Sequence, residues 1–236
     1  MKAVILIAIL SFVTIGCNNA NPLKEFHPGN NSTTKVDSVR YSQAPPIAWK
    51  IAEAHGIENW NGISEIGFTF NVDRNGSHFW RSWTWKPKTG DIQMISTTDT
   101  VRYNRSRMDS LTMKTDAAFI NDKYWLLTPF QLVWDQGMDF SERENAMAPI
   151  SKDTLNLLTV VYPNVGGYTP GDAYDFFYDK NFRIKEWNYR KGNAADPNTT
   201  TTWEEYKNFD GIDIATMHQN GEKDFKLYFT DISIKK

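Results

Sequence analysis

The residues whose types and spacing could do chemistry are few in this chain. Residues 71–76 (NVDRNG) resemble the front of a calcium-binding loop. Such a loop has an acidic first ligand and a bidentate Glu at its twelfth position, whereas these positions hold Asn71 and Ser82 here. We therefore interpret the stretch as a β-turn between two strands, and we predict no metal site.

The histidine and acidic residues also lack the spacing of a catalytic site. Four histidines occur, far apart in the sequence: His27, His55, His78 and His218. We interpret each as a surface residue or one with satisfied hydrogen bonds, rather than as a metal ligand. Asp172, Asp175 and Asp179 are separated by aromatic residues, and we predict solvent-facing alternation instead of a carboxylate pair. Familiar hydrolase, phosphate-binding and Cys-x-x-Cys motifs do not occur. We therefore predict a protein that is not an enzyme and uses no cofactor.

The single cysteine, Cys17, offers a modification chemistry instead. Residues 3–15 are apolar apart from Ser11 and Thr14, and this run is shorter than the roughly 20 residues of a membrane span. The pattern is typical of a signal peptide. Residues 14–17 (TIGC) resemble a bacterial lipobox, in which the cysteine is acylated and becomes the N-terminus. The alternative is a plain signal peptide with a chance cysteine. We predict a lipoprotein signal peptide at 1–16 and lipid attachment at Cys17.

Composition divides the rest of the chain and limits its partners. Residues 17–44 are polar and are predicted to form a flexible tether after the lipidated cysteine, and residues 45–236 suit one domain. The 26 basic and 28 acidic residues give a net charge of −2, which does not favour nucleic acid as a partner. We expect a monomer in the cell envelope, anchored to a membrane. The outer membrane, on its periplasmic or surface side, is the membrane that we favour.

Aromatic residues, 14% of the chain, are the unusual feature of the domain. In the stretch 78–87 (HFWRSWTWKP), strand geometry places Phe79, Trp83 and Trp85 on one face, with Arg81 among them. Five further aromatics from other predicted elements complete the candidate set: Trp125, Phe130, Trp187, Tyr189 and Trp203. One interpretation is that they fill the core under a sheet. The other is that they line an apolar cavity, with Arg81, Arg183 or Lys185 available to meet a lipid headgroup.

The elements that must position these residues are mostly strands. A short helix is predicted after Pro45, ending at Gly56, and an Asn75-Gly76 turn joins two long strands. Alternation predicts further strands at 91–97, 100–103, 155–162, 174–179, 183–190, 199–208, 213–218 and 225–234. Residues 108–134 lose this alternation and show helical spacing around Met113, Ala117, Ala118 and Ile120, so one or two helices interrupted at Pro129 are predicted.

Several stretches resemble a group of lipidated bacterial proteins of unknown function. They are YWLLTPFQLVWDQG (124–137), GGYTPGDAYDFFYDKNFRIKEWNYRKG (166–192), TTTWEEYKNFDGIDIATMHQ (200–219) and FKLYFTDISI (225–234). That group is similar to the LolA/LolB-like lipoprotein-carrier superfamily. The resemblance implies a mainly β (α+β) fold, a curved unclosed antiparallel β-barrel with a helical lid segment over an apolar cavity. It also implies a protruding, membrane-engaging apolar loop, for which residues 130–134 (FQLVW) are the nearest candidate, with a place in the core as the alternative.

Together these observations predict a membrane-anchored envelope lipoprotein that binds a lipid or acyl chain in an apolar cavity. Its partners would be lipid or lipoprotein acyl chains, as expected of a lipoprotein carrier or acceptor. The alternative is a non-catalytic structural or protein-interaction module with a filled core, which would act through loops such as 165–172 (VGGYTPGD). An empty or a filled interior separates these two hypotheses.

Overall fold

The computed structural model describes residues 43–236. The helices are α1 (Pro46–Ala54) and α2 (Ser110–Trp134), with short 3-10 helices η1 (Ile57–Gly62), η2 (Arg105–Arg107) and η3 (Lys191–Asn193). The strands are β1 (Glu65–Arg74), β2 (Ser77–Lys86), β3 (Asp91–Ile95), β4 (Thr100–Asn104), β5 (Asp139–Met147), β6 (Thr154–Val161), β7 (Ala173–Tyr178), β8 (Ile184–Arg190), β9 (Thr199–Thr202), β10 (Glu204–Phe209), β11 (Ile212–Gln219) and β12 (Phe225–Lys235). Short turns connect most strands, and Asn75 and Gly76 both have positive φ, as the turn between β1 and β2 requires.

The strands form two antiparallel sheets, and the chain runs directly from β9 of one sheet into β10 of the other. The seven-stranded sheet has the order β10-β11-β12-β1-β2-β3-β4, and the five-stranded sheet has the order β5-β6-β7-β8-β9. The chain passes from one sheet to the other at Trp203. Its backbone N–H donates to the carbonyl of Lys185 at 2.7 Å, and the next residue, Glu204, already pairs with Met217. Among the described residues β4 and β5 do not pair, so the curved sheet stays unclosed. The predicted mainly β, unclosed antiparallel fold is confirmed.

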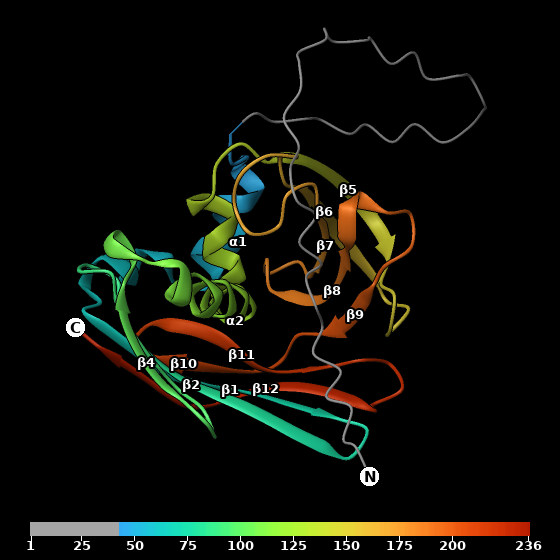
Figure 1. Cartoon of the computed structure of the whole chain (residues 1–236). Coiled ribbons are helices and arrows are strands. Elements are labelled where there is room, and N and C mark those ends of the chain that lie inside the picture. Colours follow the sequence, from blue (N-terminus) through green and yellow to red (C-terminus); the bar gives the residue numbers. More distant parts are fainter. Residues whose placement is uncertain (1–42) are drawn as a thin grey trace, which may run out of the picture. The chain divides into compact units, whose positions relative to one another are not determined.

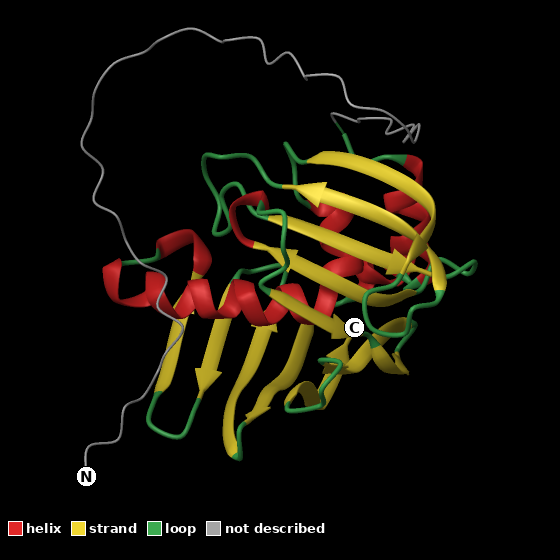
Figure 2. Cartoon of the chain, turned by 90° about the vertical axis from the view of Figure 1, so that its right-hand side faces the viewer, coloured by secondary structure: helices red, strands yellow, loops and turns green. Residues whose placement is uncertain are grey.

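Helix α2 connects β4 to β5 and lies between the two sheets (Figures 1 and 2). It begins with a capping box, in which the Asp109 carboxylate accepts from the Thr112 N–H at 2.8 Å and the Thr112 hydroxyl accepts from the Asp109 N–H at 3.0 Å. Leu127 breaks the helical geometry with φ −125° and ψ 25°. The break falls two residues before Pro129, where the proline ring excludes regular helix.

The core is divided between the two faces of α2. The Trp83 cluster, between α2 and the seven-stranded sheet, includes Phe68, Trp83, Trp85, Phe119 and Phe130. The Trp187 cluster, on the side of the five-stranded sheet, includes Tyr124, Phe176, Trp187 and Trp203. Since α2 supplies residues to both clusters, it is buried on two sides, which explains why its apolar residues do not keep to one stripe.

Three sequence predictions need correction. Strand β5 was not predicted, because its sequence DFSERENAM is rich in charge and carries a bulge at a sheet edge. The single strand predicted at 199–208 is two strands in different sheets, since the chain changes sheet at Trp203. Met113, which the helical spacing predicts on the apolar face, is exposed. The buried face at that end of α2 carries Asp116 instead.

Candidate functional site

The inward face of β2 is covered by α2. Trp83 and Trp85 are buried, and their rings lie 5.4 and 5.5 Å from the ring of Phe119. Phe79 shares their face of the strand but is 47% exposed, because it lies towards the hairpin end. The Arg81 guanidinium lies 4.9 Å from the Phe79 ring centroid. Phe79 is therefore not part of the buried aromatic surface that holds the two tryptophans.

Asp122 fixes the middle of α2 to this face, and we call its contacts the Asp122 latch. Its carboxylate accepts two hydrogen bonds from Arg81, at 2.7 and 2.9 Å, and one from the Trp83 indole N–H at 2.8 Å. The carboxylate is fully buried, while the Arg81 side chain is 22% exposed. Burial raises the pKa of Asp122, against the opposing effects of Arg81 and Trp83. Arg81 is thus engaged with the helix rather than free to meet a headgroup.

A second buried carboxylate fixes the first half of α2. Asp116 accepts hydrogen bonds from Tyr103 at 2.9 Å, from Arg105 at 2.9 and 3.2 Å, and from Tyr168. Tyr103 belongs to β4, Arg105 to η2, and Tyr168 to the loop before β7. Asp116 therefore ties together three segments that are far apart in the sequence, and the first half of α2 is held by charge-assisted hydrogen bonds.

Lys123 adds a third charged group to the buried surface of α2. Its ammonium lies 5.6 Å from the Trp85 ring, and burial lowers its pKa to about 8. Burying a charged group costs free energy, because the group must lose its hydrating water before it can pair. The helix is therefore seated on the seven-stranded sheet by a mixture of aromatic packing and buried polar contacts.

The candidates on α2 and on the five-stranded sheet meet on the other side. Trp125 of α2 has its ring 4.3 Å from that of Trp187, and Trp187 lies 5.5 Å from Trp203. Tyr189 packs 5.2 Å from Tyr174, and its hydroxyl donates to Asp172 at 2.8 Å. Trp125, Trp187, Tyr189 and Trp203 therefore belong to or pack against the Trp187 cluster.

Phe130 belongs to the Trp83 cluster instead. Its ring lies 5.9 Å from Trp60 and 5.4 Å from Trp134, and the side chain is 1% exposed. Leu132 is fully buried as well. Residues 130–134 thus lie at the end of a buried helix and do not protrude. The expected membrane-engaging loop at this position is wrong, because this part of α2 packs against both sheets.

The eight candidate residues do not form one continuous wall, because α2 separates the two clusters. Two pockets on the sheets are lined by strand residues, and neither lining includes any of the eight candidates. One, of about 160 Å³, includes Ser141 and Thr159, and the other, of about 490 Å³, includes Thr84 and Arg102. The predicted cavity therefore stays a prediction that requires α2 to move.

Polar atoms without partners gather on the side of the Trp187 cluster. Within residues 43–236, five buried side-chain atoms have no hydrogen-bond partner: Gln131 Nε2, Trp187 Nε1, Thr201 Oγ1, Trp203 Nε1 and His218 Nε2. The ring of His218 lies 4.5 Å from Trp203 and 5.3 Å from Trp125. Sequence reasoning missed this group. An isolated His on an alternating strand gave no sign that its neighbours in space would be two indoles.

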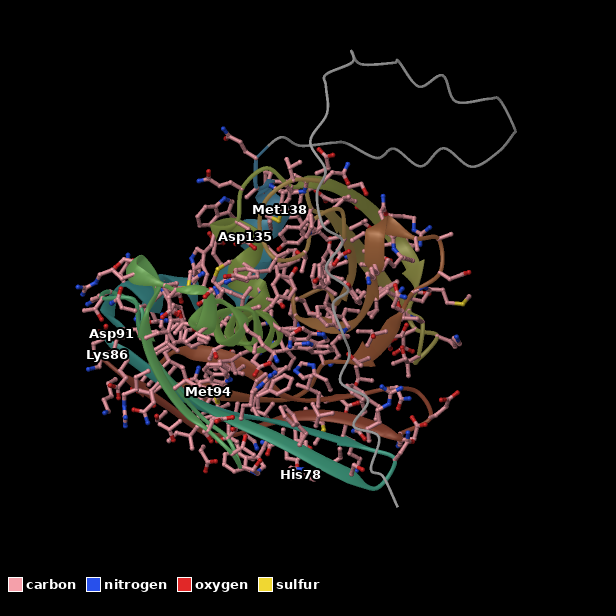
Figure 3. All side chains as sticks on the ribbon, in the orientation of Figure 1. His78, Lys86, Asp91, Met94, Asp135 and Met138 are labelled. Atoms are coloured by element: carbon pink, nitrogen blue, oxygen red, sulfur yellow. The ribbon has the colours of Figure 1, made fainter. Side chains whose placement is uncertain are left out.

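The histidine prediction needs a correction at His218, whereas His55 and His78 agree with it. His55 is buried and bonded to the carbonyl of Ile51 and to Tyr206, and its pKa is lowered to about 4 by burial. His78 is exposed and pairs with Asp73 at the hairpin end of β1 and β2 (Figure 3). His218 is neither on the surface nor fully satisfied, because β11 faces α2 and the five-stranded sheet.

The predicted solvent-facing alternation of the acidic set is wrong for two of its members. Asp175 is only 9% exposed and receives hydrogen bonds from Arg190 at 2.9 and 3.1 Å and from Thr159 at 2.8 Å. Asp172 is also buried and accepts from Tyr189 and from the Gly192 N–H. Strand β7 is central in its sheet and buried on both faces, so Asp175 needs partners inside the protein, and Asp172 directly precedes this buried strand.

Within residues 43–236 no group of three or more His, Cys, Asp or Glu side chains is placed to hold a metal ion. No helix in the same range is both long enough and apolar enough to cross a membrane. Cys17, the signal peptide and the tether up to residue 42 lie outside the described residues.

The chain matches no family model and no curated protein. Among solved structures it is similar to a LolA superfamily protein from Nitrosomonas europaea, with TM-score 0.45, 12% identity, and coverage of 80% of this chain and 94% of that one. It is also similar to a DUF1329 family protein from Desulfovibrio piger, with TM-score 0.44, 10% identity, and coverage of 80% of this chain and 93% of that one. A domain from Vibrio parahaemolyticus named for outer-membrane lipoprotein sorting matches as well, with TM-score 0.41, 11% identity, and coverage of 80% of this chain and 94% of that one. One of these three structures carries the name of the superfamily that the sequence resembles.

Proposed function

We propose that this protein is a cell-envelope lipoprotein that binds an acyl chain or similar lipid on the inner aromatic faces of its two sheets, where α2 lies in the ligand-free state. The observation that supports this best is the seating of α2. The helix is attached to the seven-stranded sheet through the buried carboxylates of Asp116 and Asp122, and its backbone is broken at Leu127. A segment whose position depends on a few buried polar contacts as well as on apolar packing can exchange with a ligand that replaces the apolar part.

A ligand that replaces α2 must offset both its polar and its apolar contacts. Removing one partner of a buried ion pair such as Arg81–Asp122 costs about 3–5 kcal/mol, which is an upper figure for a pair whose two groups both return to water, and α2 also gives up its apolar packing in the two clusters. Burial of each methylene group returns about 0.8 kcal/mol, so an acyl chain of about sixteen carbons contributes on the order of 10 kcal/mol before the cost of association. An acyl chain can therefore offset the loss of one latch, whereas a ligand with only a few carbons cannot.

The proposed anchor is the acylated Cys17, with residues 17–44 as a tether between the membrane and the domain. An anchored binding protein would act as an acceptor or resident lipid carrier rather than as a free shuttle. We place it in the outer membrane, facing the periplasm or the surface. Labelling with a radioactive fatty acid, compared between the wild type and Cys17→Ser, tests the anchor. Loss of label in the variant is expected, and retained label would contradict it.

Binding is tested on the full chain carrying Cys17→Ser. Mass spectrometry of an organic extract should show stoichiometric lipid, and the stripped protein should bind a fluorescent fatty-acid probe saturably. Trp83→Ala and Trp187→Ala should each weaken probe binding, because one indole is lost from either inner face. Trp49→Ala is the matched control, since Trp49 is half-exposed on α1 and belongs to neither cluster.

A second candidate function is that of an interaction module with a filled core. The observation that favours it is the direct packing of Phe119 and Trp125 of α2 on the candidate tryptophans. Its interaction surface would be the loop before β7, in which Val165 is 81% exposed while Tyr168 is fixed to Asp116. Absence of lipid and of probe binding, with Trp83→Ala and Trp187→Ala lowering only stability, would support this candidate and contradict the first.

A further inference from the structure

Trp187, Trp203, His218 and Thr201 form a polar group inside the Trp187 cluster, which we call the indole–imidazole group. The four residues come from β8, the junction of β9 and β10, β11 and β9. None is more than 1% exposed. Each has one polar atom for which residues 43–236 supply no hydrogen-bond partner. An unpaired buried polar atom costs about 1–3 kcal/mol, so four such atoms close together require an explanation.

The rings of this group lie against one another and under one residue of α2. The ring centroids of Trp187 and Trp203 are 5.5 Å apart, and those of Trp203 and His218 are 4.5 Å apart. Trp125 of α2 lies 4.3 Å from Trp187 and 5.3 Å from His218. Thr201 is the cross-strand partner of Trp187. The unpaired atoms therefore belong to side chains in mutual contact, at the surface that a displaced α2 would uncover.

The hydrogen-bonding roles in the group are complementary. His218 Nδ1 lies 3.1 Å from the carbonyl oxygen of Thr202, which can only accept, so we assign the proton to Nδ1 and leave Nε2 as an acceptor. Burial lowers the pKa of His218 to about 3, which keeps the ring neutral. The two indole N–H groups can only donate. A single partner that serves both kinds of atom therefore accepts from an indole and donates to the imidazole.

A neutral hydroxyl group meets these requirements, and charged groups do not. A carboxylate has no proton to donate to Nε2 and would lose its hydration in an apolar site, and an ammonium cannot accept from an indole. We propose that the indole–imidazole group is a subsite for the hydroxyl head of a neutral amphiphile, such as a fatty alcohol or a monoacylglycerol. This inference rests on the proposed function, because it places the head of the ligand whose acyl chain replaces α2.

The first test compares 1-dodecanol with its methyl ether in displacement of the fluorescent acyl probe from the full chain carrying Cys17→Ser. The ether keeps the acceptor oxygen and the chain but has no proton to donate. We expect the alcohol to bind about tenfold more tightly. His218→Phe should bring the two affinities together, because it removes the acceptor and keeps an aromatic ring. Trp203→Phe should lower the affinity for the alcohol. Trp60→Phe removes an indole outside the group and should preserve the preference for the alcohol over the ether.

Equal binding of alcohol and ether by the unsubstituted protein would overturn the subsite while leaving acyl binding intact, since water would then satisfy these atoms. If no long-chain compound displaces the probe, the proposed function fails. The subsite then fails with it, because a shorter alcohol cannot displace α2 and the indole–imidazole group stays covered.

Discussion

The two aromatic clusters on either side of α2 differ in how their polar atoms are satisfied. In the Trp83 cluster the indole N–H of Trp83 donates to Asp122, which also receives Arg81. In the Trp187 cluster the indoles of Trp187 and Trp203 have no partner among the described residues. Both clusters bury tryptophans almost completely, so burial alone does not distinguish them.

The difference assigns separate tasks to the two sides of the helix. In the Trp83 cluster, the hydrogen-bonding capacity of Trp83 is used within the protein and fixes the position of α2. In the Trp187 cluster, such capacity is left over, and unused capacity beside an apolar surface is what a ligand with one polar head can satisfy. We propose that both clusters contact the ligand chain, that the Trp83 cluster also holds the closed state, and that the Trp187 cluster also recognises the polar head.

The largest expected effect comes from removing the latch. Asp122→Ala leaves the Arg81 guanidinium and the Trp83 N–H without their acceptor, and it should lower the free energy of unfolding by about 3–5 kcal/mol. Urea denaturation measures this loss. The control is Asp213→Ala, whose partner Arg183 is about one-third exposed, and which should lose no more than about 1 kcal/mol. Equal losses in both variants would show that Asp122 has no special role in seating α2.

Part of this arrangement could be predicted from the sequence. Alternation of apolar and polar residues predicts most of the strands, and the Asn75-Gly76 pair predicts the first hairpin. The loss of alternation predicts the helical segment. Of the eight candidate aromatics, five are buried, Trp125 and Tyr189 are partly buried, and Phe79 is exposed because it lies beyond the part of β2 that α2 covers. These features depend on local periodicity and turn chemistry, which one sequence displays directly.

The latch and the indole–imidazole group could not be predicted in this way. Asp122 and Arg81 are 41 positions apart, and Asp122 in a helical segment has the ordinary sequence signature of a solvent-facing residue. His218 and Trp187 are brought together only because the chain changes sheet at Trp203. Both features depend on long-range packing, and local propensity carries no information about which polar residue will face the core.

A smaller effect should appear when a single indole N–H is removed from either cluster. Trp83→Phe and Trp187→Phe shorten a buried indole to the same ring, so their losses of apolar area are matched. Trp83→Phe also removes a hydrogen bond to a buried carboxylate, worth about 2 kcal/mol, whereas Trp187→Phe removes an unpaired donor. We expect Trp83→Phe to be the less stable variant by about that amount in urea denaturation. Equal stabilities would remove the contrast between the clusters.

The smallest effect concerns pH and has opposite signs in the two clusters. Burial lowers the pKa of His218 to about 3 from 6.5, so over the interval between these values the unfolded chain binds a proton that the native state does not. The free energy of unfolding therefore decreases as the pH decreases through this interval. This one group contributes about 1 kcal/mol of that loss between about pH 6 and pH 5.

The raised pKa of Asp122 acts in reverse, because the native state then binds the proton more readily than the unfolded chain does, and stability rises as pH falls through its titration. Acid sensitivity in the pH 6 to 5 interval should consequently come from the Trp187 side, with a parallel contribution from His55. Urea denaturation of the wild type and of His218→Phe at the two pH values measures the His218 part as a difference. An identical pH dependence in both proteins would mean that the imidazole already has a partner able to hold its proton, and the acceptor assigned to Nε2 would be lost with it.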